Sequence, residues 1–163
     1  MEPRIDTHTP EYQEEMKPLL GVENFLNRCG LEPRLMELLR LRVSQINGCA
    51  YCLDMHWKDL RALGESEQRL YGLDAWEESP YYTARERAAL RWAEAVTNLH
   101  EGHAPDAVYQ AVRAEFTERE LVHLTMAVGM INLWNRLAIP LRIVPGAYVS
   151  RYLPAPASTA ASS

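Results

Sequence analysis

The chain of 163 residues lacks long apolar runs and carries only a modest charge of one sign. No stretch approaches the roughly 20 consecutive apolar residues of a membrane helix, so we expect no membrane partner. The opening stretch MEPRIDTHTPEYQEEMK has neither the basic start nor the apolar core of a signal peptide, which predicts a cytoplasmic protein. A formal net charge of −5, with arginines scattered among glutamates, argues against nucleic acid as a partner.

Cysteine is also scarce, with three residues in the chain. Three are too few for a disulfide scaffold, and in a reducing cytosol a close pair is more often catalytic or metal-binding than structural. Cys49 and Cys52, in the stretch INGCAYCLDMH, form such a pair, and His56 follows them. Cys29 has no base near it in sequence, and we expect it to be an inert packing residue.

Strand patterns are almost absent, whereas helix signals recur. Thr9 and Glu32 each precede a proline, as caps before the first helical residue often do. Thr83 to Glu86 and Thr117 to Glu120 have the spacing of capping boxes. Together these signals predict helices at residues 10–28 (interrupted near Pro18), 33–47, 49–63, 66–72, 83–99, 105–115 and 117–137.

The length of the chain fits one domain with one core. We predict an all-α, single-domain helical bundle of about six to seven helices over residues 9–153. Residues 1–8 are predicted to be a flexible N-terminus, and residues 154–163, which are small and rich in proline, a disordered tail. The apolar helices of so short a chain expose more hydrophobic surface than one core can hide, so we expect a homo-oligomer.

A helix that begins near Cys49 gathers the candidate reactive groups on one side. At 100° per residue, Cys52 lies about 60° and His56 about 20° to the same side of Cys49, facing the interior or a pocket. The imidazole could accept the Cys52 proton, and the two thiols could close a disulfide. Three interpretations stay open from these residues alone: a redox dithiol, two core cysteines, or a zinc site. Such a zinc site would need a distant fourth ligand, from His100, His103 or Cys29.

The preceding predicted helix, residues 33–47, is apolar around most of its circumference. Glu37, Arg40 and Ser44 share the narrow polar strip that remains. Such a strip is either a solvent window or the lining of a polar site, and the window is the commoner outcome. Asn135, in the helix at 117–137, belongs to a polar set for which we expect a structural network or a subunit contact.

Taken together, Glu37, eleven intervening residues, Cys49-Ala-Tyr-Cys52 and His56 resemble the active-site pattern of the alkylhydroperoxidase D-like group within the carboxymuconolactone decarboxylase family. The stretches TARERAALRWAEAVT and FTERELVHLTMAVGMINLWNRLA are similar to later helices of these proteins. One position departs from the pattern. The best-studied type carries a histidine immediately before the second cysteine, where this chain has Tyr51.

The resemblance implies an all-α fold assembled into trimers or hexamers, and a thiol-dependent peroxidase acting on hydrogen peroxide or organic hydroperoxides without a cofactor or a metal. By this resemblance Cys52 attacks the peroxide, Cys49 resolves the sulfenic acid as a disulfide, and Glu37 with His56 forms a proton relay. An unidentified dithiol reductant would restore the thiols. The alternatives are a non-enzymatic zinc-binding or redox-sensing oligomer that uses the same thiols, and decarboxylase-like acid/base chemistry at Glu37 and His56. The decarboxylases of the family lack the cysteine pair, which disfavours the latter.

Overall fold

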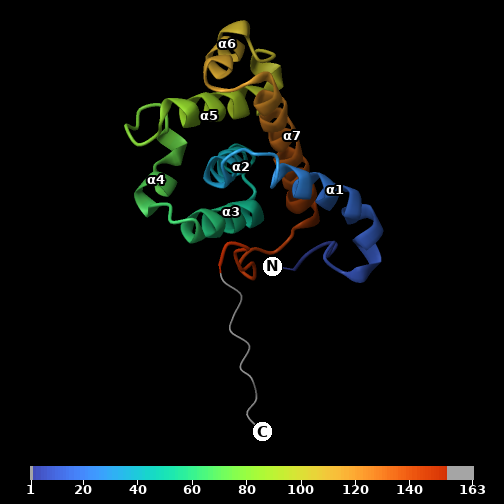
Figure 1. The fold of residues 1–163 in the computed structure, drawn as a ribbon. Helices are drawn as coiled ribbons and strands as arrows, with labels where there is room; N and C mark the ends of the chain where they lie inside the picture. Colours follow the sequence, from blue (N-terminus) through green and yellow to red (C-terminus); the bar gives the residue numbers. More distant parts are fainter. Residues whose placement is uncertain (1, 154–163) are drawn as a thin grey trace.

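A computed structural model describes residues 2–153, and within that range the chain is helical, without strands (Figure 1). The predicted all-α fold is therefore confirmed. The elements, in chain order, are the short 3-10 helix η1 (Pro10–Tyr12), α1 (Gln13–Leu26), α2 (Pro33–Asn47), α3 (Ala50–Ala62), α4 (Glu67–Tyr71), η2 (Leu73–Ala75), α5 (Ala84–Thr97), η3 (Leu99–Glu101), α6 (Asp106–Glu115) and α7 (Glu118–Leu141). The predicted tail at 154–163 lies outside the described residues.

Helix α2 lies in the centre of the fold, and α3, α5 and α7 pack around it (Figure 1). Its sequence is apolar on nearly every side, so burial against several neighbours removes more apolar surface from water than one contact would. Helix α1 packs on α7, and α6 packs on α5. This arrangement holds α2 and α3 side by side, with the turn between them close to α7.

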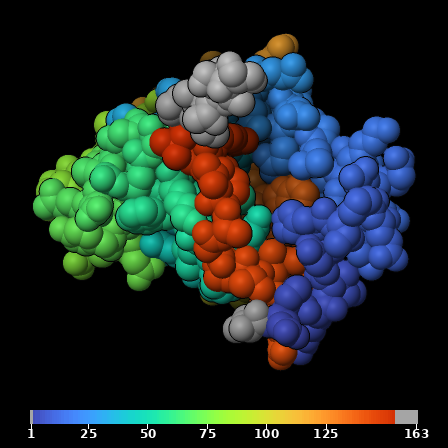
Figure 2. Space-filling view, turned by 90° about the horizontal axis from the view of Figure 1, so that it is seen from below, coloured from blue at the N-terminus to red at the C-terminus, as the bar shows by residue number. Residues whose placement is uncertain are grey.

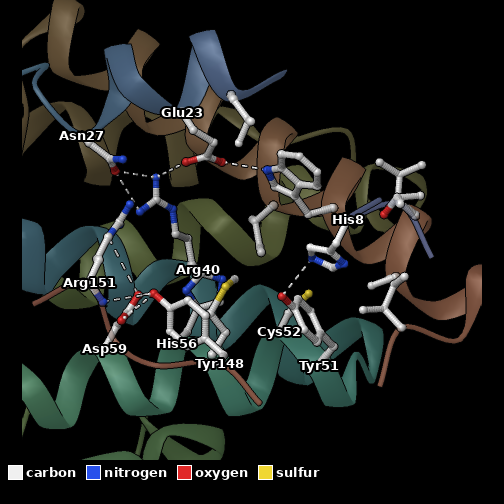
Figure 3. Close-up of a pocket in the computed structure, with 18 of the residues that line it drawn as sticks. His8, Glu23, Asn27, Arg40, Tyr51, Cys52, His56, Asp59, Tyr148 and Arg151 are labelled. Atoms are coloured by element: carbon white, nitrogen blue, oxygen red, sulfur yellow. Dashed lines mark hydrogen bonds and ion pairs between the residues drawn. The ribbon is translucent and has the colours of Figure 1, made fainter. Parts of the chain in front are cut away.

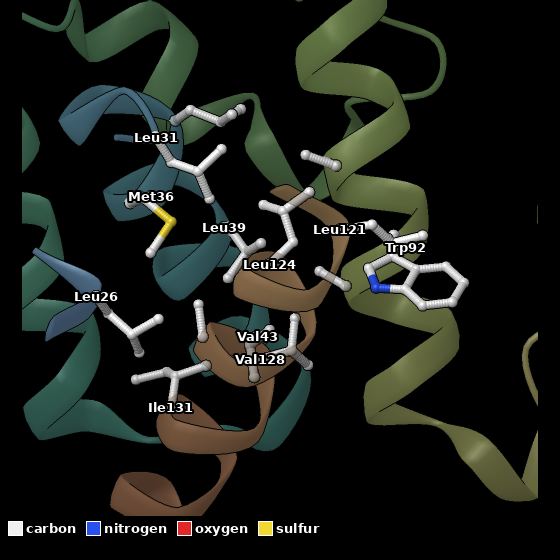
Figure 4. Packing of buried hydrophobic residues seen from close by; sticks show 14 of the residues in the cluster. Leu26, Leu31, Met36, Leu39, Val43, Trp92, Leu121, Leu124, Val128 and Ile131 are labelled. Carbon is white, nitrogen blue, oxygen red and sulfur yellow. The ribbon is translucent and has the colours of Figure 1, made fainter. Parts of the chain in front are cut away.

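The main core lies where α2 meets α7 (Figure 4). Leu39 and Val43 of α2 and Leu124, Val128 and Ile131 of α7 are almost completely buried there. A second cluster, on another side of α2, is formed by Leu38, Leu41, Leu60, Leu70, Leu73, Trp76, Tyr82 and Leu90. Apolar packing thus fixes α2 on both sides, and its polar side chains are held in place with it.

All four predicted cap positions are confirmed, and at two of them the side chain itself caps the helix. Thr83 and Thr117 form complete capping boxes at the starts of α5 and α7. The Thr9 hydroxyl instead donates to the carbonyl oxygen of Asp6, and the Glu32 carboxylate accepts from Arg85. Each of these side chains found a stronger or nearer partner than the backbone N–H groups of the following helix.

The predicted interruption at Pro18 is wrong, because α1 continues through this residue. Proline removes only the hydrogen bond to the carbonyl of Glu14, and both residues are exposed, so water can serve that carbonyl instead. At the other end of the chain α7 includes Pro140 in its last turn and ends at Leu141, four residues beyond the predicted end.

Residues 142–153, which we call the C-terminal strap, leave α7 and run back across α3 without regular secondary structure (Figure 2). Lys58 of α3 donates to the carbonyl oxygens of Gly146 and Tyr148 at 2.9 and 3.1 Å. The backbone N–H of Gly146 donates to Asp54, also on α3. The strap is therefore tied to the helix that carries His56.

Within residues 2–153, none of the helices combines the length and the hydropathy that crossing a bilayer requires.

Candidate active site

The turn between α2 and α3 places the two cysteines. Gly48 ends α2 with φ of +68°, a left-handed conformation that is cheapest for glycine. Cys49 is then the N-cap of α3, and its sulfur accepts a hydrogen bond from the backbone N–H of Cys52. The side chains of Cys49, Cys52 and His56 are all buried, as the helical spacing predicted.

The thiols of Cys49 and Cys52 are free, and their sulfur atoms lie 2.7 Å apart. The hydrogen bond between the two sulfurs, opposed by burial, lowers the pKa of Cys49 to about 7. The same hydrogen bond, together with burial and the Cys49 charge, raises the pKa of Cys52. The amide of Asn135 favours the thiolate at both positions. One proton therefore leaves the pair readily, and the second is held firmly between two sulfurs.

Glu37 comes from the centre of α2 and is fully buried. One carboxylate oxygen, Oε2, lies 2.7 Å from Nδ1 of His56, and the other accepts from Arg40 at 2.7 Å. Burial alone would raise the pKa of Glu37, but the hydrogen bond and charge of His56 and the charges of Arg40 and Arg151 hold it well below its usual range. The carboxylate is therefore ionised at neutral pH.

The ionised carboxylate of Glu37 also determines which nitrogen of His56 carries a proton in the neutral ring. A carboxylate can only accept a hydrogen bond, so Nδ1 must donate to it, and Nε2 is left with its lone pair. Nε2 is buried and has no hydrogen-bond partner within the described residues. His56 is thus an oriented base with its basic nitrogen available.

Charged groups from three parts of the chain lie around His56 (Figure 3). Arg40 also donates to Glu23 of α1 at 2.8 Å. From the C-terminal strap, Arg151 donates to Oε1 of Glu37 at 2.5 Å and lies 3.9 Å from Asp59. The hydroxyl groups of Ser150 and Tyr148 donate to Asp59. The carboxylates of Glu23, Glu37 and Asp59 are therefore paired with two guanidinium groups, those of Arg40 and Arg151.

A cavity of about 410 Å³, which we call the thiol pocket, opens beside these groups (Figure 3). Cys52 and His56 line it, whereas Cys49 does not. Its apolar lining is formed by Leu20, Met55, Ile131, Trp134, Leu137, Ala138 and Ile143. The volume is within the range of small-molecule sites, and an apolar wall with a few polar groups is typical of them.

Tyr51, the position at which this chain departs from the family pattern, also lines the thiol pocket. Its hydroxyl lies 3.4 Å from Nε2 of His8, and the two rings lie 5.9 Å apart. His8 belongs to the N-terminal stretch for which flexibility was predicted, and that prediction is untested. In the structure this stretch brings a second imidazole to the edge of the pocket.

The structure brings together all four residues that the sequence singled out, Glu37, Cys49, Cys52 and His56, and adds several that it did not. Arg40 was recognised as part of the polar strip on α2, but the strip is buried and lines the site instead of facing solvent. Asp59 and Arg151 gave no sequence signal, because only the folded chain brings the strap into contact with Asp59 of α3 and with Glu37 of α2. Asn135 was expected in a structural network; it donates to Ser44 and also acts on the thiols.

The described residues offer little support for the zinc site that the sequence left open. Among them the one compact group of three candidate ligands is Glu37, His56 and Asp59, with ligand atoms within 4.8 Å of one another. That group does not include the cysteines, and Arg40 and Arg151 already occupy its carboxylates. His100 and His103 are exposed between α5 and α6.

This chain is similar to members of one protein family. The sequence profile of the carboxymuconolactone decarboxylase family matches residues 10–95. The uncharacterized protein YdfG of Bacillus subtilis is 40% identical over 126 residues, which are 77% of this chain and 86% of YdfG.

Solved structures add a likeness in fold. ATU0492 of Agrobacterium tumefaciens matches with a TM-score of 0.84 and 42% identity, and the match covers 90% of this chain and all of ATU0492. ATU0492 is a protein of unknown function that has been provisionally assigned as the antioxidant defence protein AhpD. The debrominase Bmp8 matches with a TM-score of 0.73 and 16% identity, over 84% of this chain and 74% of its own. At that identity the likeness concerns the fold alone, and it shows that the fold is not restricted to one reaction.

Proposed function

We propose that this protein, which belongs to the carboxymuconolactone decarboxylase family as an alkylhydroperoxidase D-like member, is a thiol-dependent peroxidase that reduces hydrogen peroxide or organic hydroperoxides. The observation that carries the proposal is the combination of two adjacent thiols with an oriented base, His56, beside one small-molecule pocket. No cofactor or metal is required for this chemistry. We place the protein in the cytoplasm, where reducing conditions keep such thiols free.

In the first step His56 accepts the proton of the Cys52 thiol through Nε2. The thiolate attacks one oxygen of the peroxide, the O–O bond breaks, and Cys52 becomes a sulfenic acid. The departing oxygen receives the proton from His56 and leaves as water or an alcohol. Glu37 stays ionised throughout and holds the imidazolium in place between the two proton transfers.

In the second step the sulfur of Cys49 attacks the sulfenic sulfur of Cys52. A disulfide forms, the hydroxyl of the sulfenic acid leaves, and with a proton it is released as water. The peroxide has then accepted two electrons from the two thiols. A dithiol reductant returns these electrons by thiol–disulfide exchange.

The assignment of Cys52 as the attacking residue rests on access to the pocket. The lowered pKa favours a resting thiolate on Cys49, but Cys49 does not line the thiol pocket and Cys52 does. Once His56 has taken the first proton from the pair, the two sulfurs share the remaining one, and with that proton on Cys49 the charge lies on Cys52, the sulfur that a peroxide can reach. A thiolate that is easy to form and a sulfur that is easy to reach are thus combined in one pair.

We further propose that the protein acts as a homo-oligomer, a trimer or a hexamer. Apolar side chains of α7 remain exposed along one stripe, at Val122, Met126 and Leu133, and Phe25 of α1 is exposed as well. Stripes of this kind are common at subunit interfaces. The oligomer size can be measured directly by light scattering.

The test is a peroxide-consumption assay with a dithiol reductant that compares the wild type with Cys52→Ser and Cys49→Ser. We expect both variants to lose turnover, and a sulfenic acid to be trappable in Cys49→Ser alone. Turnover that survives in Cys52→Ser would overturn the proposal. Cys29→Ser is the matched control, because Cys29 packs at the edge of the core without a base beside it, and it should keep wild-type turnover.

The two alternatives make different predictions in the same preparations. A redox-sensing or zinc-binding oligomer would show no catalytic turnover, and stoichiometric zinc would be found in protein purified without a chelator. Decarboxylase-like chemistry at Glu37 and His56 would survive replacement of both cysteines by serine. The adjacent sulfurs and the arginine-occupied carboxylates favour the peroxidase over both.

A further inference from the structure

We infer that Arg151 of the C-terminal strap is a positioning residue for the proton relay: its guanidinium compensates the charge of Glu37 and Asp59, so that His56 is free to accept a proton at neutral pH. The inference rests on the proposed function, because it assigns a role to Arg151 within that site. It extends the site beyond residues 37–56, to a part of the chain that is more than a hundred positions away in sequence.

The contacts of the strap hold the guanidinium of Arg151 at one carboxylate oxygen of Glu37. Arg151 donates to Oε1 of Glu37, and the Tyr152 hydroxyl lies 3.3 Å from the same oxygen. The other oxygen, Oε2, is left to His56. Ser150 and Tyr148 donate to Asp59, so consecutive parts of the strap engage both carboxylates that flank the imidazole.

Arg151 is not needed merely to pair Glu37, since Arg40 already does so from the next turn of α2. The reason for a second guanidinium lies in the count of charges around the site. Glu23, Glu37 and Asp59 carry three negative charges when ionised, whereas Arg40 alone carries one positive charge. Without Arg151 the site would have an excess of two negative charges, and protonation of the imidazole would relieve part of it.

The groups that face the relay can be named element by element. The N-terminal stretch contributes His8, α1 contributes Glu23, α2 contributes Glu37 and Arg40, and α3 contributes Tyr51, Cys52 and Asp59. The strap contributes Tyr148, Arg151 and Tyr152, and the pocket-lining side chains of α7 are uncharged. Removal of Arg40 would take the guanidinium from Glu23 and from Glu37 together, whereas removal of Arg151 leaves Arg40 paired with both carboxylates.

The sign of the effect follows from the charge. Replacing Arg151 by a neutral residue makes the surroundings of His56 more negative, so the imidazole should hold its proton to a higher pH. A base must be neutral to accept a proton, so the acidic limb of the activity profile should move to higher pH as well. Arg151 is partly solvated and reaches His56 only through Glu37, so we expect the shift to be on the order of 0.5–1 pH unit.

The test measures the titration of His56 in Arg151→Met by nuclear magnetic resonance of the histidine ring protons, with His56→Gln used to assign the signal. This readout needs no peroxide, so it distinguishes a failure of the inference from a failure of the proposed function. The pH dependence of kcat/KM is measured on the same proteins. Arg91→Met is the matched control, because Arg91 pairs with Glu77 on the surface and makes no contact with the site.

We expect an upward shift of both titrations in Arg151→Met, a profile close to wild type in Arg151→Lys, and no shift in Arg91→Met. An unchanged or downward-shifted His56 titration in Arg151→Met would overturn the inference, and so would an equal shift in Arg151→Lys or Arg91→Met. If Arg151→Met does not fold, Arg151→Gln replaces it with the same expectation. The glutamine can still donate to Glu37 but carries no charge, so a wild-type titration in that variant would also overturn the inference.

Discussion

Replacing Glu37 by glutamine removes the charge at the centre of the site while keeping the shape of the side chain. In the wild type this buried carboxylate is bonded to Arg40, Arg151 and His56. Removal of one partner of a buried ion pair costs about 3–5 kcal/mol when the other charge is left uncompensated. Arg40 keeps Glu23, and Arg151 is partly exposed, so we expect Glu37→Gln to lower the free energy of unfolding by about 2–3 kcal/mol at neutral pH.

The pH dependence of this difference gives a second check. The pKa of Glu37 is lowered in the folded protein, because its partners outweigh the effect of burial. Its contribution is therefore fully present above the unfolded pKa of about 4.3 and is lost as pH falls below that value. The stability difference between wild type and Glu37→Gln should shrink by about 1–2 kcal/mol between pH 5 and pH 3.

Urea denaturation followed by tryptophan fluorescence measures both quantities, at one protein concentration so that self-association does not interfere. Glu77→Gln is the control, because the Glu77–Arg91 pair is exposed and its loss should change stability by less than about 1 kcal/mol. Equal stability of Glu37→Gln and wild type at pH 7 would refute the reasoning. A difference that grew on acidification would refute it as well.

Three further outcomes are expected. Thiolate absorbance of a Cys29→Ser protein should show one thiol per chain ionising near pH 7 and the other still protonated at far higher pH, and simultaneous ionisation of both would contradict the shared proton. Leu39→Ala should lower the free energy of unfolding by about 2–5 kcal/mol, whereas Leu20→Ala, at a half-exposed position, should cost clearly less; equal losses would contradict the assigned core. Thr117→Ala should cost about 1 kcal/mol through the loss of a capping box, measured by the same denaturation, and an unchanged midpoint would speak against that cap.

Local patterns in the sequence were sufficient for much of the fold. The apolar circumference of α2 and the capping boxes of α5 and α7 depend on neighbouring residues, and they predicted these elements correctly. Pro18 misled the prediction because the cost of a proline depends on whether water reaches the carbonyl it leaves free. That accessibility is a tertiary property.

The candidate site was predictable in part for the same reason. Cys49, Cys52 and His56 lie within one helix and its cap, so their spacing alone placed them on one side. Glu37 required the resemblance, because its contact with His56 joins two helices. Arg151 could not be predicted, since it lies in a segment without periodicity and reaches Glu37 only because the strap turns back over α3.

The most direct test of the account is mass spectrometry of the reduced protein after one equivalent of peroxide. The account predicts a loss of two hydrogen atoms per chain and a Cys49–Cys52 disulfide in the peptide that contains both residues, with Cys29 still a thiol. The same peptide recovered with both thiols intact, or with oxidation confined to Cys29, would contradict it.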